Sequence, residues 1–234
     1  MSLWERLTDL DWTPFVLSFK LAAATTLILF FLALPLAWWL SRTRSRGKPL
    51  IEALAALPIV LPPSVLGFYL LWGLSPQSPL GAFFEETLGV KLVFSFPGLV
   101  VASCLYSLPF MLQPLQSGFE SLDRRMIEAS YLAGKGPWQT LWRIALPNIK
   151  PSLVTALIVT FAHTVGEFGV VLMVGGSIPG QTRVASVAIY ELVETMEYGT
   201  AHIYSAILLL LSFGILLGVF AFNRRQKRRR GGLS

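Results

Sequence analysis

Five long apolar stretches constrain the fold of this chain more than any other feature of its sequence. They cover, approximately, residues 14–40, 50–73, 92–114, 152–174 and 201–222. A helix needs about 20 apolar residues to cross the hydrocarbon core of a bilayer, and each stretch is long enough. Because lipid offers no partner for backbone N–H and C=O groups, such a stretch must pair its own backbone as a helix. We therefore predict an all-α, polytopic integral membrane protein with about five transmembrane helices, forming a single domain over residues 1–234.

Composition excludes the other common classes of fold. Hydrophobic residues make up 54% of the chain and charged residues only 14%, whereas soluble proteins carry about 25% charged residues. A soluble domain of 234 residues has too small an interior to bury so many apolar side chains. The single cysteine, Cys104, cannot form a disulfide within the chain, so a disulfide-rich secreted scaffold is excluded as well.

The distribution of Lys and Arg predicts the orientation of the chain. If the loops at 41–49 and 115–151 and the C-terminal end are cytoplasmic, fifteen of the 19 basic residues lie inside. The four that remain outside are Arg6, Lys20, Lys91 and Arg183. Because cytoplasmic loops carry the excess of Lys and Arg, we predict the N-terminus outside and the C-terminus inside. The basic segment 224–230 would then contact anionic membrane lipid, and we expect no nucleic-acid partner.

The loop at 115–151 has the pattern of two short helices. The first is predicted from an N-cap at Ser121 to a stop at Gly134, and the second from Pro137 to Pro147. Trp138, Leu141, Trp142 and Ala145 follow helical spacing and predict one apolar face. Two such helices could dock into a groove of another protein or lie on the lipid surface, and the pattern alone leaves both open.

A longer pattern in this loop resembles a known family. It consists of Glu128, Ala129, Gly134, Ile144, Leu146 and Pro147. This spacing is similar to the EAA loop of ABC importer permeases, with Ser130 in place of the second alanine. The resemblance implies that the loop forms coupling helices that sit in a cleft of a cytoplasmic ATPase subunit. Glu128 would then be the docking acid, and Gly134 the turn between the helices.

The resemblance extends to molybdate-type permeases over nearly the whole chain. It is carried by "LPIVLPPSVLGFYLL" in the second span, by residues 166–190 and by the five-span arrangement. Sulfate-type permeases are similar around Gly166–Gly169 and Ile178-Pro179, but they usually have a longer chain with an additional span. The resemblance therefore implies an importer of molybdate (or tungstate), with sulfate or thiosulfate as the alternative.

This resemblance also implies the fold and the partners. The fold would be that of a type I ABC importer permease in the cell (inner) membrane, working as a homodimer with the anion path along its two-fold axis. An extracytoplasmic molybdate-binding protein would deliver the anion, and a cytoplasmic ABC ATPase dimer would supply the energy.

Candidate residues for the translocation path or its gate lie in three places. Pro62 and Pro63, next to Ser64, free backbone carbonyls that lipid cannot satisfy, although a kinked packing helix is an equally good reading. Glu167 is an acid deep in a span, where a charge costs a few kcal/mol. We therefore expect its side chain to hold a gate or helix contact through hydrogen bonds, for example to His163. Direct contact with the translocation path is the alternative. Arg183 could attract an oxyanion, or form a salt bridge with the binding protein or with Glu191.

The sequence contains no pattern for catalysis, nucleotide or metal. The Gly-Lys pairs at 47–48 and 134–135 lack the remainder of a phosphate-binding loop, and His163 has no second ligand at metal-binding spacing. We therefore expect a non-enzymatic subunit without a cofactor or metal, driven by a partner ATPase.

An ion-coupled secondary transporter with Glu167 as proton carrier is the rival from another class, but it predicts an inverted repeat that the five unequal spans do not show. An intramembrane enzyme would need a nucleophile–base pair that the spans lack.

Overall fold

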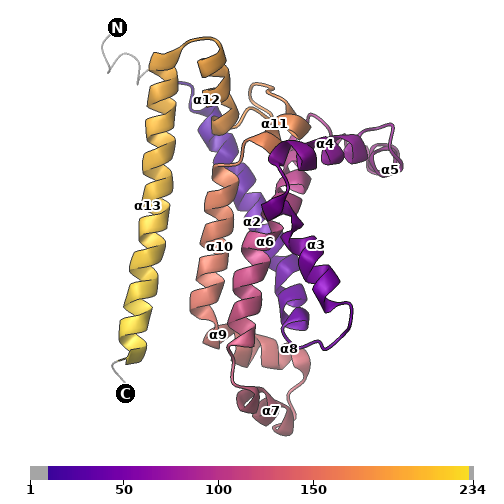
Figure 1. Cartoon of the computed structure of the whole chain (residues 1–234), viewed down its shortest axis with the longest axis vertical. Coiled ribbons are helices and arrows are strands. Elements are labelled where there is room, and N and C mark those ends of the chain that lie inside the picture. The colour runs from indigo at the N-terminus through magenta and orange to yellow at the C-terminus, as the bar shows by residue number, and fades with distance from the viewer. Residues whose placement is uncertain (1–9, 232–234) are drawn as a thin grey trace.

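The structure, a computed structural model, describes the backbone of residues 10–231, and every regular element in that range is a helix (Figure 1). Arg6 and the side chains of the basic segment 224–230, which entered the charge count, lie outside the described part. The prediction of an all-α membrane protein is confirmed.

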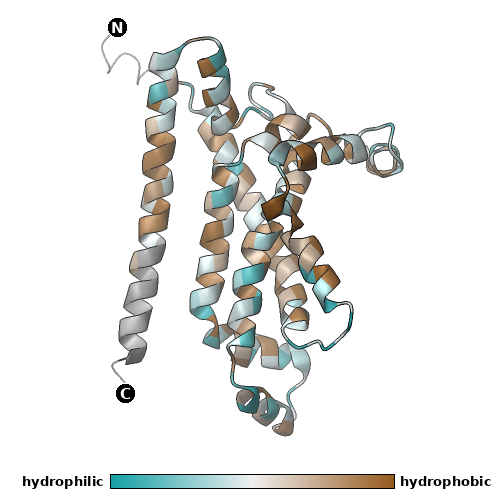
Figure 2. Ribbon diagram, in the orientation of Figure 1, coloured by the Kyte–Doolittle hydropathy of each residue, from teal (hydrophilic) through white to brown (hydrophobic). Residues whose placement is uncertain are grey.

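Within residues 10–231, three helices are long and apolar enough to cross a membrane. They are α2 (Thr13–Leu40), α6 (Phe96–Glu120) and α13 (Tyr198–Gly231). A serine cap begins α6, because the Ser95 hydroxyl accepts a hydrogen bond from the Gly98 N–H (3.3 Å). In Figure 2 the described part of α13 is largely apolar, with polar residues near its upper end.

The other two spans are bent. Helices α3 (Lys48–Val60) and α4 (Pro63–Leu74) meet at 112°, so the pair counts as one broken span or as a re-entrant segment. Leu61 has an extended backbone (ψ 136°) because a residue before proline is pushed out of the helical region. The second bent pair consists of Pro137–Asn148 and α10 (Lys150–Val165), which meet at 83°, and it counts as a fifth candidate span only when the two parts are taken together.

The predicted continuous helix over 152–174 is wrong in its last third. Helix α10 ends at Val165, and a separate short helix, α11 (Gly169–Gly175), begins after three intervening residues. Glycines stand at both edges of the interruption, Gly166 and Gly169, and glycine disfavours helix by about 1 kcal/mol relative to alanine. We call Gly166, Glu167 and Phe168 the α10–α11 break.

The core lies between α2, α6 and α10, which pack against one another along their length (Figure 1). Its largest cluster includes Leu29, Leu40, Met111, Leu115 and Ala156. Helix α13 stands at one edge, packed on α10 and on α12 (Ala185–Glu194). Helices α4 and α5 (Pro79–Leu88) project to the opposite side.

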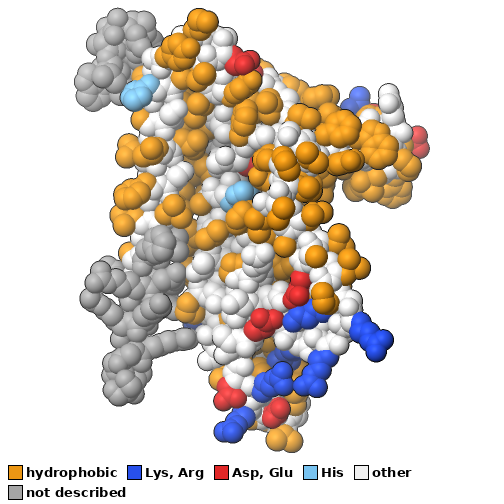
Figure 3. Space-filling model, viewed as in Figure 1, with side chains coloured by type: hydrophobic (Ala, Val, Ile, Leu, Met, Phe, Trp, Pro, Cys, Tyr) orange, Lys and Arg blue, Asp and Glu red, His pale blue; other side chains and the backbone are white. Residues whose placement is uncertain are grey.

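One end of the molecule carries most of the described basic side chains. The loop 41–47 and the segment made of α7 (Arg124–Leu132), α8 (Pro137–Thr140), the π-helical turn Leu141–Ala145 and α9 (Leu146–Asn148) lie together there (Figures 1 and 3). The structure thus brings to one end the two loops that the charge count assigned to one side of the membrane.

Candidate functional site

The first candidate site is the α7–α9 unit, residues 124–148, at the basic end of the molecule. Helix α7 begins two residues later than predicted: its cap is Asp123, whose carboxylate accepts from the Arg125 N–H (2.9 Å), and not Ser121. The predicted stop is confirmed. Gly134 has φ +75°, a left-handed conformation that favours glycine, and its N–H donates to the Tyr131 carbonyl oxygen (2.9 Å).

A buried pair of hydroxyl groups joins the two halves of this unit. The Ser130 and Thr140 hydroxyl oxygens lie 2.8 Å apart, and both residues are buried. Ser130 is the position at which the sequence departs from the EAA pattern, so the departure supplies a hydrogen bond that alanine cannot make. Because the pair satisfies two buried polar groups, it holds the angle between α7 and α8.

The residues of the EAA-like pattern divide between the surface and the core. Glu128 and Ala129 are exposed on α7, whereas Leu146 is 7% exposed and packs in the main core cluster. Ile144 is half-buried and Pro147 is exposed. The unit is therefore anchored through its second half and presents its first half, with the Glu128 carboxylate, to the surroundings.

The predicted apolar face of the second helix is only half correct. Leu141 and Ala145 are buried, but Trp138 and Trp142 are 63% and 51% exposed. Residues 141–145 form a π-helical turn, whose wider spacing separates positions that an α-helix would place on one side. Two exposed tryptophans beside an exposed acid are typical of a protein-docking surface.

The second candidate site is the α10–α11 break. Glu167 is 3% exposed, and its carbonyl oxygen accepts a hydrogen bond from the Ser186 hydroxyl. Its carboxyl group lies near the Ser103 hydroxyl of α6, yet neither carboxyl oxygen has a hydrogen-bond partner of standard geometry among the described residues. An unpaired buried carboxyl group is unfavourable, so the break holds a polar group that this arrangement does not satisfy.

The predicted hydrogen bond between Glu167 and His163 is wrong. The His163 ring stacks on Phe110, with the ring centroids 3.9 Å apart, and lies 5.0 Å from the Tyr106 ring centroid. The prediction assumed a continuous helix that would align the two side chains, but α10 ends between them.

Helix α4 packs closely on α11, directly after the break. A Cβ atom added at Gly169 would lie 2.8 Å from the Pro63 Cβ, and one added at Gly67 would lie 2.8 Å from the Met173 Cβ. The structure thus brings the Pro62-Pro63-Ser64 segment beside the break, although about a hundred residues separate them in the sequence. Gly67 and Met173 carry this contact and were not singled out by the sequence.

Arg183 lies between the start of α2 and α12. Its guanidinium group lies 3.2 Å from the Asp11 carboxylate and 3.9 Å from the Glu191 carboxylate, so it joins the start of α2 to α12. Hydrogen bonds from Thr13, and then the charge of Arg183, hold the pKa of Asp11 below its usual value. Of the partners considered for Arg183, the structure contains Glu191, in addition to Asp11. In the described part of the chain no hydrogen bond or ion pair links Arg183 to Glu167 or Ser64.

Comparison with known proteins places these sites in context. Residues 22–229 match the family described as binding-protein-dependent transport system inner membrane component. The molybdenum transport system permease protein ModB of Azotobacter vinelandii is 47% identical over 229 residues, covering 97% of this chain and 99% of that protein. ModB of Escherichia coli K12 is 30% identical over the same shares of the two chains.

A sulfate-type relative and two solved structures are also similar to this chain. A probable sulfate transport system permease protein, cysT of Chlorokybus atmophyticus, is 34% identical over 88% of this chain, but the match covers only 72% of that longer protein. Among solved structures, an inward-facing MetNI methionine ABC transporter matches with a TM-score of 0.73 at 18% identity, covering 96% of this chain and 99% of the other. A bacterial alginate ABC importer matches with a TM-score of 0.74, also at 18% identity, over 91% and 78% of the two chains. These structures support the fold.

Proposed function

From the premise that this chain belongs to the family of binding-protein-dependent transport system inner membrane components, we propose that it is the permease subunit of an ATP-driven molybdate importer. The observation that carries the proposal is the 47% identity to a molybdenum permease over nearly the full length of both chains. Tungstate, a tetrahedral dianion of similar size, would share the path. The lower identity and longer chain of the sulfate-type relative make sulfate the second candidate.

The partners in this proposal are a second copy of the chain, a cytoplasmic ABC ATPase dimer and an extracytoplasmic molybdate-binding protein. The exposed Glu128, Trp138 and Trp142 support an ATPase contact at the α7–α9 unit, because a docking surface needs charge and aromatic area that water can reach. Orientation follows from the same proposal: the end that carries this unit would be cytoplasmic, with the chain's C-terminus inside and its N-terminus outside.

The route by which ATPase motion reaches the path is supported by the packing. The α7–α9 unit is held rigid by the Ser130–Thr140 pair and leads through Ile149 directly into α10. Helix α10 has 16 residues and so extends about 24 Å, from the docking surface to the α10–α11 break. A displacement at the unit would therefore move the break against Pro63 and α4, and the gate would open or close there.

Glu167 would act in this gate through hydrogen bonds and not as a binding charge. An ionised carboxylate repels a dianion, whereas the unpaired Glu167 carboxyl group is free to find partners in a second arrangement of the break. Hydrogen bonds to the anion along such a path must be weak, since a tight site would trap it.

The test is uptake of labelled molybdate into proteoliposomes that contain this chain, its ATPase and its binding protein, with ATP supplied on the ATPase side. We expect ATP-dependent uptake that excess tungstate inhibits and excess sulfate does not. Glu128→Arg and Gly134→Pro should each reduce uptake to background, with Gln77→Ala in an exposed distant loop as the matched control. Molybdate uptake that is unchanged by both substitutions, or that is driven by a proton gradient without ATP, would overturn the proposal.

A further inference from the structure

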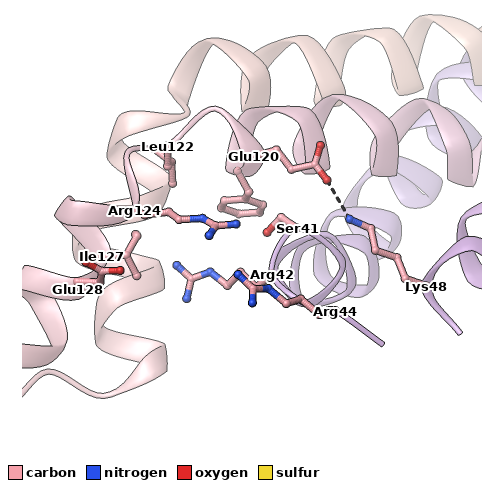
Figure 4. A pocket seen from close by; sticks show the side chains of 10 residues that line it. Ser41, Arg42, Arg44, Lys48, Glu120, Leu122, Arg124, Ile127 and Glu128 are labelled. Carbon is pink, nitrogen blue, oxygen red and sulfur yellow. Dashed lines mark hydrogen bonds and ion pairs between the residues drawn. The ribbon is translucent and has the colours of Figure 1, made fainter. Parts of the chain in front are cut away.

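A pocket of about 500 Å³ opens at the basic end of the molecule, between the end of α2 and the α6–α7 connection. Figure 4 shows its lining, to which the loop after α2 contributes Arg42 and Arg44 and the start of α7 contributes Arg124. The proposed function uses only Glu128 of the residues in this lining.

None of the three guanidinium groups in the pocket lining forms an ion pair with a carboxylate of the described residues. Arg42 lies with its guanidinium carbon 3.3 Å from the centroid of the Trp38 ring and donates a hydrogen bond to the Tyr131 hydroxyl (3.0 Å). Arg44 and Arg124 form no ion pair or hydrogen bond with the residues that the structure describes. Their side chains extend into the same space from opposite walls (Figure 4).

The acids nearby are already engaged. The Glu120 carboxylate lies 3.3 Å from the Lys48 ammonium group and accepts a hydrogen bond from the Gln116 amide (3.0 Å). Lys48 also lies 3.6 Å from Glu52. Of the acids that line the pocket, this leaves Glu128, which is exposed on α7, forms no ion pair among the described residues and is assigned to the ATPase by the proposed function.

Three guanidinium groups that share a small space repel one another unless an anion lies between them. Guanidinium groups match tetrahedral oxyanions because their planar N–H forks can each donate two parallel hydrogen bonds. Arg42 is held in place by Trp38 and Tyr131, so less of its conformational freedom is lost on binding.

We propose that this pocket binds a tetrahedral oxyanion, carried either by the headgroup phosphate of an anionic lipid or by a free anion in the cytoplasm. The pocket lies next to the end of the α2 span, where Trp39 is 44% exposed, and so at the depth of lipid headgroups. A bound oxyanion would link the loop after α2 to α7 and thereby fix the α7–α9 unit to the membrane body. The cytoplasmic location rests on the proposed function, but anion binding does not.

The test measures binding without transport. The purified complex of this chain with its ATPase, in neutral detergent and without ATP or binding protein, is titrated in separate arms with phosphatidylglycerol, phosphatidylcholine, inorganic phosphate and molybdate. Native mass spectrometry counts bound lipid, and equilibrium dialysis with labelled phosphate or molybdate measures the free anions. The double variant Arg44→Gln/Arg124→Gln removes two donors, and Arg46→Gln, in the same loop but outside the pocket lining, is the matched control.

We expect at least one anionic probe to bind the unmutated chain and the control equally, and to bind the double variant about tenfold more weakly or worse. Phosphatidylglycerol binding without free-anion binding identifies a lipid site, and the reverse identifies a site for cytoplasmic oxyanions. Molybdate that binds all three proteins equally occupies the translocation path and not this pocket. The proposal is overturned if no anionic probe distinguishes the double variant from the control.

Folding of the double variant is checked by size-exclusion elution of the intact complex, and Arg44→Lys/Arg124→Lys provides a second variant that keeps both charges. The lysine variant should bind the anionic probe more weakly than the unmutated chain does, because ammonium groups lack the planar pair of N–H donors of a guanidinium group. It should bind the probe more tightly than the glutamine variant does, because it keeps both positive charges. Since none of these measurements needs uptake, a failed transport assay and a failed pocket assay are distinguishable.

Discussion

The α7–α9 unit and the α10–α11 break lie at opposite ends of α10 and differ in whether their buried polar side chains have hydrogen-bond partners. In the unit, the Ser130 and Thr140 hydroxyls pair with each other. At the break, the Glu167 carboxyl oxygens and the Ser103 hydroxyl have no partner of standard geometry within the described residues. A surface that transmits force benefits from a single rigid arrangement, whereas a gate needs groups that two arrangements can satisfy in turn. The predictions below test this contrast.

The largest effect is expected where α4 approaches the break. Gly67→Val should destabilise the protein by about 1–3 kcal/mol, because its added carbons meet Met173 in a packed contact. Gly73→Val, on the same helix with nothing within 4 Å of an added Cβ, is the control and should lose far less. Denaturant unfolding in mixed micelles provides the comparison. Equal losses in both variants would mean that α4 does not depend on this close approach.

Removing the unpaired acid should stabilise the resting protein while harming transport. Glu167→Leu is expected to raise the free energy of unfolding by about 1–3 kcal/mol, since it eliminates a buried polar group without a partner. Glu167→Gln should assemble normally but reduce molybdate uptake, because the amide cannot reproduce the hydrogen bonding of a carboxyl group. Normal uptake by Glu167→Gln would exclude a gate role.

Removing one hydroxyl group of the Ser130–Thr140 pair should lower the free energy of unfolding, the opposite of the effect expected for Glu167→Leu. Thr140→Val leaves the Ser130 hydroxyl buried and unpaired, at a cost of about 1–2 kcal/mol. Ser130→Ala/Thr140→Val should recover part of that loss, because neither polar group then remains. A double-mutant cycle on unfolding free energies measures the coupling, and a coupling near zero would remove the support for a rigid unit.

The smallest effect concerns the ion pair between Asp11 and Arg183. Hydrogen bonds from Thr13, and then Arg183, lower the pKa of Asp11 in the folded chain, so its carboxylate contributes stability above the ordinary pKa of 3.8 and loses it as the pH falls through the lower folded value. Because Asp11 is exposed, the contribution should stay below about 1 kcal/mol. Asp11→Asn should unfold with a weaker pH dependence between about pH 5 and pH 3 than the unmutated chain does. Identical pH profiles would show that the pair adds nothing.

The same contrast explains which features the sequence could predict. The turn at Gly134, the restart at Pro137 and the EAA-like spacing all lie within about twenty consecutive residues, so local rules for caps and turns apply directly. The contact of Pro63 with Gly169 joins segments that are distant in the chain, and no local rule predicts it. Nor did the sequence reveal the pocket, because its arginines come from two loops whose meeting depends on the packing of α2 against α6.

Two incorrect predictions had a common cause. Both the apolar face through Trp138 and the hydrogen bond from His163 to Glu167 assumed uninterrupted α-helical spacing. A π-helical turn at Leu141–Ala145 ended that spacing in the first case, and the glycines around the break ended it in the second. The glycines were a visible signal in the sequence, whereas the π turn was not.

The 112° bend between α3 and α4 has a consequence for assembly. Helix α3 has 13 residues and rises about 20 Å, which falls short of the roughly 30 Å of hydrocarbon that a span must cross. Pro62 and Pro63 lack N–H groups, so the carbonyls of Pro58 and Ile59 lose the donors that would stand four residues on. In the proposed homodimer a neighbouring copy would shield these carbonyls from lipid, whereas an isolated subunit would leave them without a donor.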